Sequence, residues 1–408
     1  MAKIDDSVKK KVPELRFKGF TDDWEERKLG ELASFSKGNG YTKNDLVEFG
    51  DPIILYGRLY TKYETVIEKV DTFVNKKDNS IISEGSEVIV PASGESSEDI
   101  SRASVVGKSG LILGGDLNII KPVNYIDSIF LALTISNGSQ RQEMSKRAQG
   151  KSVVHLHNSD LKQVNLLYPK LEEQQKIGTF FKQLDCAIAL HQRKLDLLKE
   201  QKKGYLQKMF PKNGAKVPEL RFAGFADDWE ERKLGELGSV AMNRRIFKDQ
   251  TSENEEVPFF KIGTFGSKPD AFISRELFEE YKLKYPYPEI GDVLISASGS
   301  IGRTVVYQGE DEYFQDSNIV WLKHDNRLDN KFLKQFYSIV KWQGLEGSTI
   351  KRLYNKNILD TDISIPSTIE QNKIGMFFEQ LDDTIALHQR KLDLLKEQKK
   401  GFLQKMFV

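Results

Sequence analysis

The chain has 408 residues, with 61 Lys and Arg against 60 Asp and Glu, and a formal net charge of +1. This length exceeds what one hydrophobic core supports, so we expect two or more domains. No apolar run approaches the roughly 18 residues of a membrane helix, and the single cysteine, Cys186, excludes an internal disulfide. These properties predict a cytoplasmic protein with no membrane partner. The balanced charge means that a DNA-binding role would require basic residues concentrated on one face.

A lead segment occurs twice in the chain. Residues 11–32 read KVPELRFKGFTDDWEERKLGEL, and residues 216–237 read KVPELRFAGFADDWEERKLGEL. The carboxylates of the first copy, Asp22, Asp23, Glu25 and Glu26, stand in a predicted polar turn that leads into Leu29. We interpret them as solvated or capping groups rather than as a general acid and base.

Each lead segment is followed by a variable block of short β-rich runs separated by turn residues. The sequence GSEVIVPASG at 85–94 matches GDVLISASG at 291–299, which indicates that both blocks share one α+β fold. One modest helix is expected in each block, at 126–136 and at 330–340. The predicted strands cover residues 53–56, 80–90, 104–106, 111–113, 118–120, 164–168, 293–296, 303–307 and 319–322. Since the other residues differ almost everywhere, the blocks are typical of two modules with different ligands.

A long amphipathic helix is predicted after each block, and residues 190–204 match residues 387–401 letter for letter. Apolar residues recur at alternating steps of four and three, which is the heptad pattern of a coiled coil. Lys202 and Lys399 continue the pattern as polar positions that fix register, and Gly178 and Gly204 indicate close approach or fraying. The predicted seam consists of Ile177, Phe181, Leu184, Ile188, His191, Leu195 and Leu198 in the first helix and of Ile374, Phe378, Leu381, Ile385, His388, Leu392 and Leu395 in the second.

One such helix cannot bury its apolar stripe alone, and its own copy is the natural partner. Two halves related by a pseudo-twofold axis require the helices to run antiparallel. We therefore predict an α+β protein with two similar globular domains of mixed β-sheet and helices, separated by two long helices that form an antiparallel coiled coil. The predicted bounds are 1–171 and 211–368 for the globular domains and 172–210 and 369–408 for the helices.

Motifs for catalysis, nucleotides or metals are weak in this sequence. The GKS runs at 107–109 and 150–152 lack the earlier glycine of a phosphate loop, because Arg102 and Ser145 stand there. His155 and His157 would share one face of a strand, but no third metal ligand is evident. The sequence also has no Asn-Pro-Pro-aromatic element and no G-x-G-x-x-G after a strand. We therefore predict no catalytic residue, no metal site and no cofactor in this chain.

Basic residues interleaved with polar and aromatic groups are the more informative signal. Lys and Arg hold phosphates, whereas Arg, Asn and Ser also read base edges. For any single residue, ordinary solvated surface is an equal alternative. The residues predicted to bind DNA are Arg58, Tyr60, Arg102, Arg141, Arg147, Lys151, His155, Asn243, Arg244, Arg245, Lys261, Ser298, Ser300, Arg303, Ser348, Lys351 and Arg352.

The order and duplication of these elements resemble the specificity subunit of type I restriction–modification systems, over essentially the whole chain. The resemblance rests on WEERKLGEL at 24–32 and again at 229–237, on GDVLISASGSIG at 291–302, and on Pro366 followed by EQNKI at 370–374. The first block departs from this pattern, because Ser86 and Glu87 follow Gly85 where the second block has one Asp.

The resemblance implies that each block is a target recognition domain that reads one half of a bipartite double-stranded DNA sequence, and that the coiled coil sets the gap. The same helices would dock two methyltransferase subunits, which two restriction subunits with translocase activity join. The methyltransferase partner would bind S-adenosylmethionine, and the restriction partner would bind ATP and magnesium, so this chain is expected to be non-catalytic. Two alternatives remain open: a coiled-coil tether with two protein-binding heads and no DNA role, and a self-sufficient nuclease or methylase, which the missing motifs disfavour.

Overall fold

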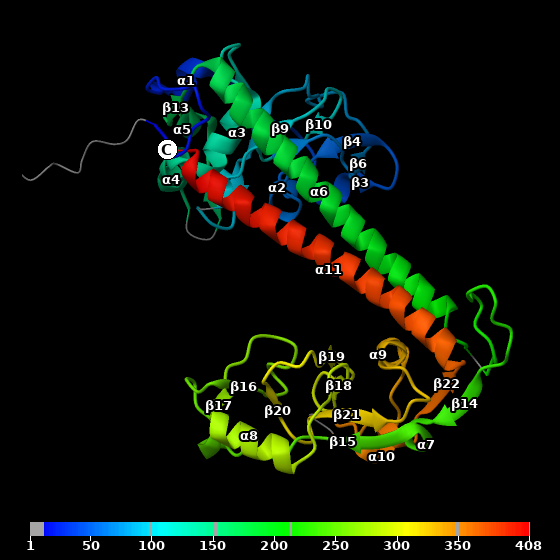
Figure 1. The fold of residues 1–408 in the computed structure, drawn as a ribbon. Coiled ribbons are helices and arrows are strands. Elements are labelled where there is room, and N and C mark those ends of the chain that lie inside the picture. Colours follow the sequence, from blue (N-terminus) through cyan, green and yellow to red (C-terminus); the bar gives the residue numbers. More distant parts are fainter. Residues whose placement is uncertain (1–11, 98, 151–152, 213, 348–350, 408) are drawn as a thin grey trace, which may run out of the picture. The chain divides into compact units, whose positions relative to one another are not determined.

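The structure is a computed structural model that describes residues 12–97, 99–150, 153–212, 214–347 and 351–407 (Figure 1). The chain forms two compact units, Met1–Arg193 with Gln389–Val408, and Lys194–His388. Both unit boundaries fall inside long helices, α6 (Leu171–Lys208) and α11 (Thr368–Lys405), which have 38 residues each. Every unit therefore contains a globular part together with portions of both helices. We call residues 25–168 the first head and residues 230–365 the second head.

The first head is built on a five-stranded sheet in the order β2-β11-β7-β9-β5, beside a four-stranded sheet in the order β10-β4-β6-β3. A separate two-stranded ladder pairs β1 (Glu25–Lys28), from the lead segment, antiparallel with β13 (Asn165–Tyr168), which directly precedes α6. The other elements are α1 (Leu29–Leu32), β2 (Ala33–Lys37), η1 (Lys43–Asp45), β3 (Leu46–Val47), β4 (Asp51–Ile54), α2 (Arg58–Thr61), β5 (Val66–Ile67), β6 (Phe73–Val74), β7 (Val88–Pro91), β8 (Ser93–Gly94), η2 (Asp99–Ser101), β9 (Ser104–Val106), β10 (Ile112–Leu113), β11 (Leu117–Pro122), α3 (Ser128–Asn137), α4 (Ser139–Arg147), β12 (Val154–His155) and α5 (Asn158–Lys162).

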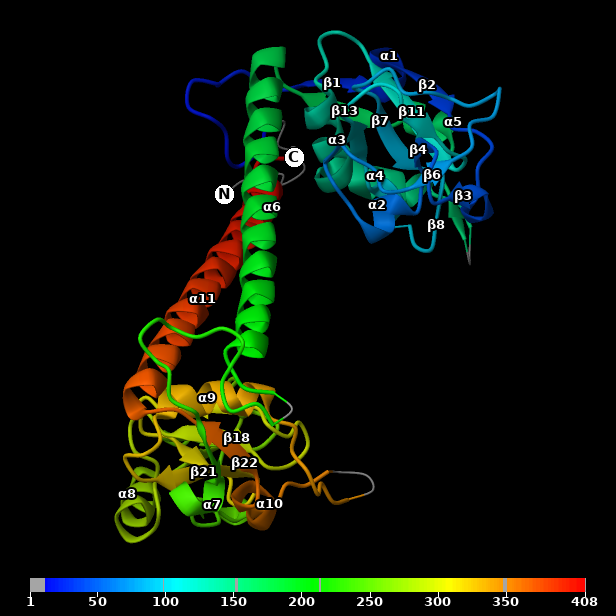
Figure 2. The ribbon, with the colours of Figure 1, turned by 90° about the vertical axis from the view of Figure 1, so that its right-hand side faces the viewer.

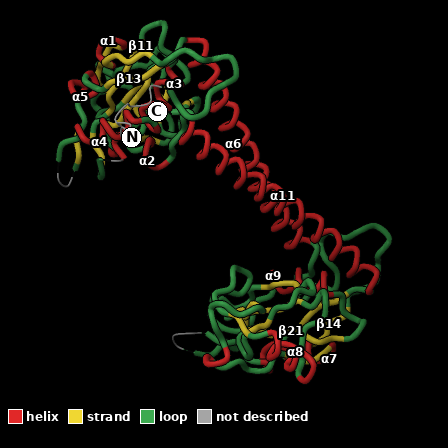
Figure 3. The backbone as a smooth tube through the Cα atoms, turned by 60° about the vertical axis from the view of Figure 1, so that its left-hand side comes forward, coloured by secondary structure: helices red, strands yellow, loops and turns green. Residues whose placement is uncertain are grey.

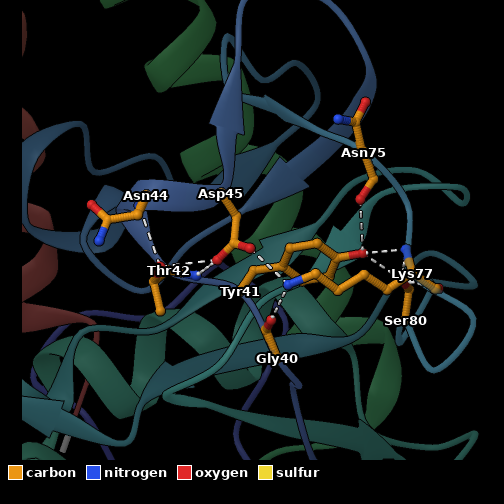
Figure 4. Close-up of polar contacts among 8 residues, drawn as sticks. All are labelled: Gly40, Tyr41, Thr42, Asn44, Asp45, Asn75, Lys77 and Ser80. Carbon is orange, nitrogen blue, oxygen red and sulfur yellow. Dashed lines mark hydrogen bonds and ion pairs between the residues drawn. The ribbon is translucent and has the colours of Figure 1, made fainter.

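A polar cluster secures the loop before the four-stranded sheet (Figure 4). The buried Tyr41 hydroxyl accepts the backbone N–H of Lys77 at 2.7 Å and lies 2.6 Å from the Ser80 hydroxyl. The Lys77 ammonium donates to Asp45 at 2.7 Å and lies 4.5 Å from the centre of the Tyr41 ring. Hydrogen bonds from Lys77 and then from Thr42 lower the pKa of Asp45 to about 2. The cluster ties residues 40–45 to residues 75–80.

The second head repeats this plan with a four-stranded sheet in the order β15-β21-β18-β19 and a three-stranded sheet in the order β17-β16-β20. Its lead strand β14 (Glu230–Lys233) pairs antiparallel with β22 (Asp362–Ile365), which directly precedes α11. The other elements are α7 (Leu234–Leu237), β15 (Gly238–Ala241), η3 (Lys248–Gln250), β16 (Val257–Phe260), β17 (Phe272–Ile273), α8 (Arg275–Lys284), β18 (Val293–Ser296), β19 (Thr304–Val306), β20 (Tyr313–Phe314), β21 (Ile319–His324), α9 (Asn330–Ile339) and α10 (Asn355–Leu359).

Corresponding strands show that the two heads share one topology, as predicted. The order β2-β11-β7-β9 corresponds to β15-β21-β18-β19, and in the smaller sheets a parallel pair, β4 with β10 or β16 with β20, adjoins an antiparallel strand. Figure 3 shows strands mixed with loops in both heads. The predicted strand at 80–90 is wrong in extent, since the regular strand is Val88–Pro91. Positive φ angles at Gly85 (94°) and Ser86 (71°) turn the chain just before it. The helices α4 and α8 were not predicted.

The core of each head is closed by the start of one long helix and the end of the other. In the first unit, Ile177 and Phe181 of α6 join Met406 and Phe407, beyond the end of α11, in one cluster with Trp24. In the second unit, α11 contributes Ile374 and Phe378, and the α6 end contributes Met209 and Phe210. Because buried aromatic rings carry large apolar areas, these helix ends are part of the head cores as well as part of the helix pair.

The two long helices run antiparallel within each unit, as predicted. In the first unit, the rings of Phe180 in α6 and Phe402 in α11 have centroids 5.0 Å apart, and in the second unit Tyr205 and Phe377 are 5.1 Å apart. Figure 2 follows α6 in green and α11 in red and orange. Every predicted seam residue is buried or half-buried; the buried ones are Ile177, Phe181, Leu195, Leu198, Ile374, Phe378 and Leu392.

The start of α6 is held by two buried polar residues. Both carboxylate oxygens of Glu173 accept from Arg16, at 2.9 and 2.7 Å, and the Glu173 side chain is only 2% exposed. The Gln174 amide donates to the backbone carbonyls of Pro169 (2.8 Å) and Tyr125 (3.1 Å) and accepts the Asp127 N–H at 2.9 Å. These contacts fasten lead segment, helix and head together. We call Glu173 and Gln174 the first clamp.

The start of α11 carries the same arrangement, which we call the second clamp. Glu370 accepts from Arg221 at 2.7 and 2.8 Å, and Gln371 donates to Pro366 and Arg327 carbonyls, both at 2.9 Å. The Asp329 N–H donates to Gln371 at 2.9 Å. A bidentate Arg–carboxylate pair gives both energy and fixed orientation, which explains the presence of an arginine and a glutamate at these positions.

The helix glycines fall into two kinds. A Cβ atom on Gly178 would lie 2.9 Å from Asp127 Oδ1, and one on Gly375 would lie 2.6 Å from Lys331 Cβ. At Gly204 and Gly401 such an atom would have no neighbour within 4 Å. Close approach therefore explains the first pair, where each long helix packs on its head.

We expect Gly375→Ala to lower the free energy of unfolding by about 1–3 kcal/mol, because the added methyl overpacks the contact between α11 and α9. Gly401→Ala on the same helix serves as the matched control. It should raise the free energy of unfolding by about 1 kcal/mol, since alanine favours a helix and has open space there. Urea denaturation followed by circular dichroism measures both. Equal effects of the two substitutions would contradict the close-approach interpretation.

We expect Arg16→Met to destabilise the first unit by about 3–5 kcal/mol, because it leaves the buried Glu173 carboxylate without its partner. Arg27→Met is the control, since Arg27 and Glu25 form an exposed pair with side chains 51% and 63% exposed. That variant should change stability by less than about 0.5 kcal/mol. Chemical denaturation measures the difference, and a cost below 1 kcal/mol for Arg16→Met would show that the clamp does not depend on this ion pair.

Candidate nucleic-acid interface

In both heads a later chain segment returns to the end of the central strand. In the second head, Ala297 follows β18; its N–H donates to the Asn318 carbonyl at 2.7 Å, and its carbonyl accepts the Leu353 N–H at 2.8 Å. In the first head, Ala92 follows β7 and binds the carbonyl of Asp116 (2.7 Å) and the N–H of Leu156 (3.0 Å) in the same way. The two heads thus present one framework of backbone contacts at this edge.

The returning segment begins with a pair of residues joined through their backbones in both heads. Gln149 and His155 exchange backbone hydrogen bonds of 3.0 and 2.8 Å, and Glu346 and Arg352 exchange bonds of 3.2 and 2.8 Å. The two bridged pairs have the same spacing in sequence but different side chains. Of the residues predicted to bind DNA, His155 and Arg352 therefore lie at corresponding positions. Lys151 and Ser348 lie outside the described residues.

Several predicted residues of the second head gather around this edge. The Ser298 hydroxyl donates to Asn318 Oδ1 at 2.6 Å, and Ser298 is bridged to Arg352. Arg245 pairs with Asp316 at 3.0 Å, two residues before Asn318. Exposed Lys351 and Arg352 have no carboxylate partner within the described parts of the chain. The arrangement leaves these two cations available to a ligand.

Other predicted residues of the second head make contacts within that head. Asn243 is buried and donates to the Pro286 carbonyl at 3.3 Å, while the exposed Arg244 lies 5.3 Å from the Tyr285 ring centre. Arg303 donates to the Phe265 carbonyl at 2.5 Å. The Ser300 carbonyl accepts a hydrogen bond from the Ser296 hydroxyl at 2.5 Å. The Lys261 ammonium pairs with the Asp270 carboxylate at 2.8 Å.

In the first head, Tyr60, Arg102 and His155 gather around Ser93. The Tyr60 hydroxyl donates to the Ser93 carbonyl at 2.8 Å, and β12 pairs His155 with Ser93. The Arg102 guanidinium lies 5.7 Å from the Tyr60 ring centre and donates to Asp99 at 2.6 Å. Burial, and then the charge of Asp99, raises the pKa of Tyr60, so this phenol stays neutral.

The first head neutralises some of its predicted DNA-binding arginines by ion pairs and leaves another without one, as a comparison of Arg58, Arg147 and Arg141 shows. Arg58 donates to Asp71 and Glu64, both at 2.7 Å, and its side chain is only 8% exposed. Arg147 pairs with Glu143 one turn earlier in α4, at 2.7 Å. Arg141 is exposed and has no ion pair among the described residues. The structure therefore presents Arg141, but not the guanidinium of Arg58, to a ligand.

The sequence reasoning missed Asn118, Asp316 and Asn318, which hold the framework at this edge. The Asn118 amide donates to the Leu156 carbonyl at 2.8 Å, and Asn318 accepts from Ser298. Both asparagines stand before an apolar run, NII at 118–120 and NIV at 318–320. The strand registers place them at different positions, because Asn118 pairs with Val90 whereas Asn318 lies just before the Ile319–Ser296 pair.

His155 and His157 have ring centroids 6.5 Å apart. Within the described residues, no group of three or more His, Cys, Asp or Glu is placed to hold a metal ion.

None of the described helices combines the length and apolar character needed to span a membrane.

Two copies of one fold, each with the same loop framework and different side chains on it, define a protein with two related recognition heads. A family model for the type I restriction modification DNA specificity domain matches residues 21–200 and again residues 226–397. The chain belongs to this family, and the duplication found in the sequence is a duplication of the family's domain.

Relatives of this chain fall into two kinds. A chain of Haemophilus influenzae, assigned as the type I restriction enzyme specificity subunit S.HindORF215P, is 56% identical over 158 residues, which are 38% of this chain and 41% of that relative. The MjaVIII specificity subunit of Methanocaldococcus jannaschii is 19% identical over 402 residues, covering 94% of this chain and 91% of the relative. High identity to the first relative is thus confined to a part of the chain.

Solved structures show the same fold at low sequence identity. The crystal structure of a type I restriction–modification S subunit from M. genitalium matches 97% of this chain and 99% of its own, with TM-score 0.68 and 16% identity. A chain from a structural study of complex assembly in the type I R-M system matches 94% of this chain and 97% of its own, with TM-score 0.51 and 18% identity.

We expect Arg352→Gln to weaken DNA binding and to reduce the slope of log affinity against log salt by about one, because each neutralised phosphate contributes about 0.9 to that slope. Lys261→Gln is the control, since the Lys261 ammonium is already held by Asp270. Fluorescence anisotropy over a salt series measures both slopes. An unchanged slope for Arg352→Gln would remove this residue from the phosphate contacts.

Proposed function

We propose that this chain is the DNA-recognition subunit of a type I restriction–modification complex, and that each head reads one half of a bipartite double-stranded target. The observation that carries the proposal is the repeated edge framework, in which Ala92 and Ala297 make the same backbone contacts while the surrounding side chains differ. Shared backbone geometry with divergent side chains is what two readers of different half-sequences require.

The charge distribution supports nucleic acid as the ligand. The chain as a whole carries a formal charge of only +1. Even so, Arg141 in the first head and Lys351 and Arg352 in the second are exposed cations that form no ion pair among the described residues, although the charge of Arg141 contributes to lowering the pKa of Asp99. Phosphate contacts from such residues set affinity, and base contacts from nearby polar groups set sequence preference.

The long helices supply the spacer in this proposal. Each has 38 residues, which correspond to about 57 Å at 1.5 Å per residue. Half-sites read in successive major grooves are about 34–36 Å apart, so a helix of this length is long enough to set a gap of about one turn. The antiparallel pairing seen within each unit supports a paired rather than a single-helix spacer.

The chemistry belongs to partner subunits in this proposal. Two methyltransferase subunits dock on the helices and bind S-adenosylmethionine, and two restriction subunits bind ATP and magnesium. The duplicated helix faces support a partner present in two copies, since identical partners need corresponding surfaces. The absence of amino-methyltransferase motifs from the sequence supports a non-catalytic role for this chain.

Exchange of residues 242–361 for the corresponding block of a family member with a different target tests the proposal. The exchange keeps β14, α7, β15, β22 and α11 in place. We expect one half of the methylated motif to change, while the other half and the gap stay the same, when the chimera is expressed with its methyltransferase partner.

Mapping of adenine methylation across the genome measures this outcome, with the parent chain as the control. A change in both halves would contradict the assignment of one half-site to each head. If the parent chain itself shows no salt-dependent DNA binding, the result would favour the alternative that this protein is a coiled-coil tether with two protein-binding heads.

A further inference from the structure

Asp382 connects three elements of the second unit. It lies in α11, and its Oδ1 accepts from Lys202 of α6 at 2.5 Å. Its Oδ2 accepts from Lys334 of α9, in the second head, at 3.0 Å. One carboxylate therefore binds the opposite long helix with one oxygen and the head with the other. We call this group of residues the second joint.

Asp185, the corresponding residue of α6, forms the first joint. Its Oδ1 accepts from Lys399 of α11, and its Oδ2 accepts the Thr65 hydroxyl of the first head at 2.9 Å. The lysines of the two helices are corresponding residues, whereas Thr65 and Lys334 come from different head elements. We call the contact between the aspartate and the opposite long helix the helix arm, and the contact between the aspartate and the head the head arm. The helix arm is the same in both units, whereas the head arm differs between them.

The joints are partly shielded from water. The side chains of Lys202 and Asp382 are 21% and 24% exposed, and those of Lys399 and Asp185 are 19% and 31% exposed. An ion pair in such a position is screened less than a fully exposed pair, so it holds its geometry more firmly. Both lysines are the polar seam positions that sequence reasoning associated with register.

One helical turn before each aspartate, the contact with the head reverses its charges. In the first unit, Lys182 of α6 pairs with Glu68 of the head at 3.2 Å. In the second unit, the corresponding residue is Glu379, and it pairs with Lys331 of the head at 2.7 Å. Each head therefore matches the helix on which it sits, although the helices are otherwise nearly the same.

We propose that Asp185 and Asp382 are positioning residues that fix the angle of each head on the helix pair and thereby determine which gap between half-sites the protein accepts. The inference rests on the proposed function, because it concerns the spacing of the two half-sequences. The clamp and the apolar core attach each head to the ends of the two helices, and the joint adds a polar contact further along the helix pair. Loss of the charge leaves the clamp and the core in place and removes this additional contact, which widens the range of angles that the head can adopt.

The test uses Asp382→Asn in the full complex with its methyltransferase partner. Substrates carry the two half-sites at the parental gap, one base pair shorter and one base pair longer. We expect the preference for the parental gap to fall by about fivefold, the factor that about 1 kcal/mol of ion-pair energy represents, with both half-sequences unchanged. Initial rates of methylation measure the preference.

Asp383→Asn is the matched control, because Asp383 is the adjacent residue, is exposed, and has no partner among the described residues. It should leave the gap preference unchanged. Lys202→Gln and Lys334→Gln remove the helix arm and the head arm separately, and each should relax the preference in part. If Asp382→Asn prevents folding, these two variants decide the question.

A lower melting temperature with an unchanged gap preference in all three joint variants would show a merely structural role and would overturn the inference. If the parent complex shows no methylation at a bipartite target, the proposed function itself fails, and the inference fails with it. Altered half-sequences in Asp382→Asn at an unchanged gap would also overturn it, since the joint would then act on base reading rather than on spacing.

Discussion

The clamp at the start of each long helix is the constraint on which the rest of the structure depends. Glu173 and Gln174 are fully shielded from solvent, and their partners come from the lead segment and from the loops that precede α3 and α6. A buried carboxylate is stable only when it is paired, so the helix cannot begin here unless the lead segment lies across it. The order of lead segment, head and helix in the sequence follows from this requirement.

The second consequence concerns the head cores. Phe407 follows α11 and packs with Phe130 of the first head at a centroid distance of 6.0 Å, and Phe210 follows α6 and stacks on Phe332 of the second head at 5.2 Å. Neither head completes its core with the residues of its own block alone. This explains why residues near the ends of the duplicated helices are apolar, and it makes the pairing of the helices a condition for folding both heads.

The sequence allowed accurate prediction of the helices and of their direction, because a heptad pattern and a duplication are visible without any tertiary information. It also located strands such as Val293–Ser296, whose apolar run is continuous. It could not show that the Arg58 guanidinium is paired with Asp71 and Glu64, since those partners depend on how short loops fold. The same limit applies to Asn318, whose role arises only when Ser298 and the returning segment meet at the end of β18.

The distribution of contacts explains how two heads diverged on one scaffold. Gln174 and Gln371 bind backbone carbonyls and a backbone N–H, which any head sequence supplies, so side chains around them are free to change. Contacts that use head side chains did change: Lys182 meets Glu68 in one unit, whereas Glu379 meets a lysine in the other. The two units therefore share the contacts to the head backbone and the side-chain pairs within the duplicated segments, whereas pairs between a long helix and a head side chain are particular to each head.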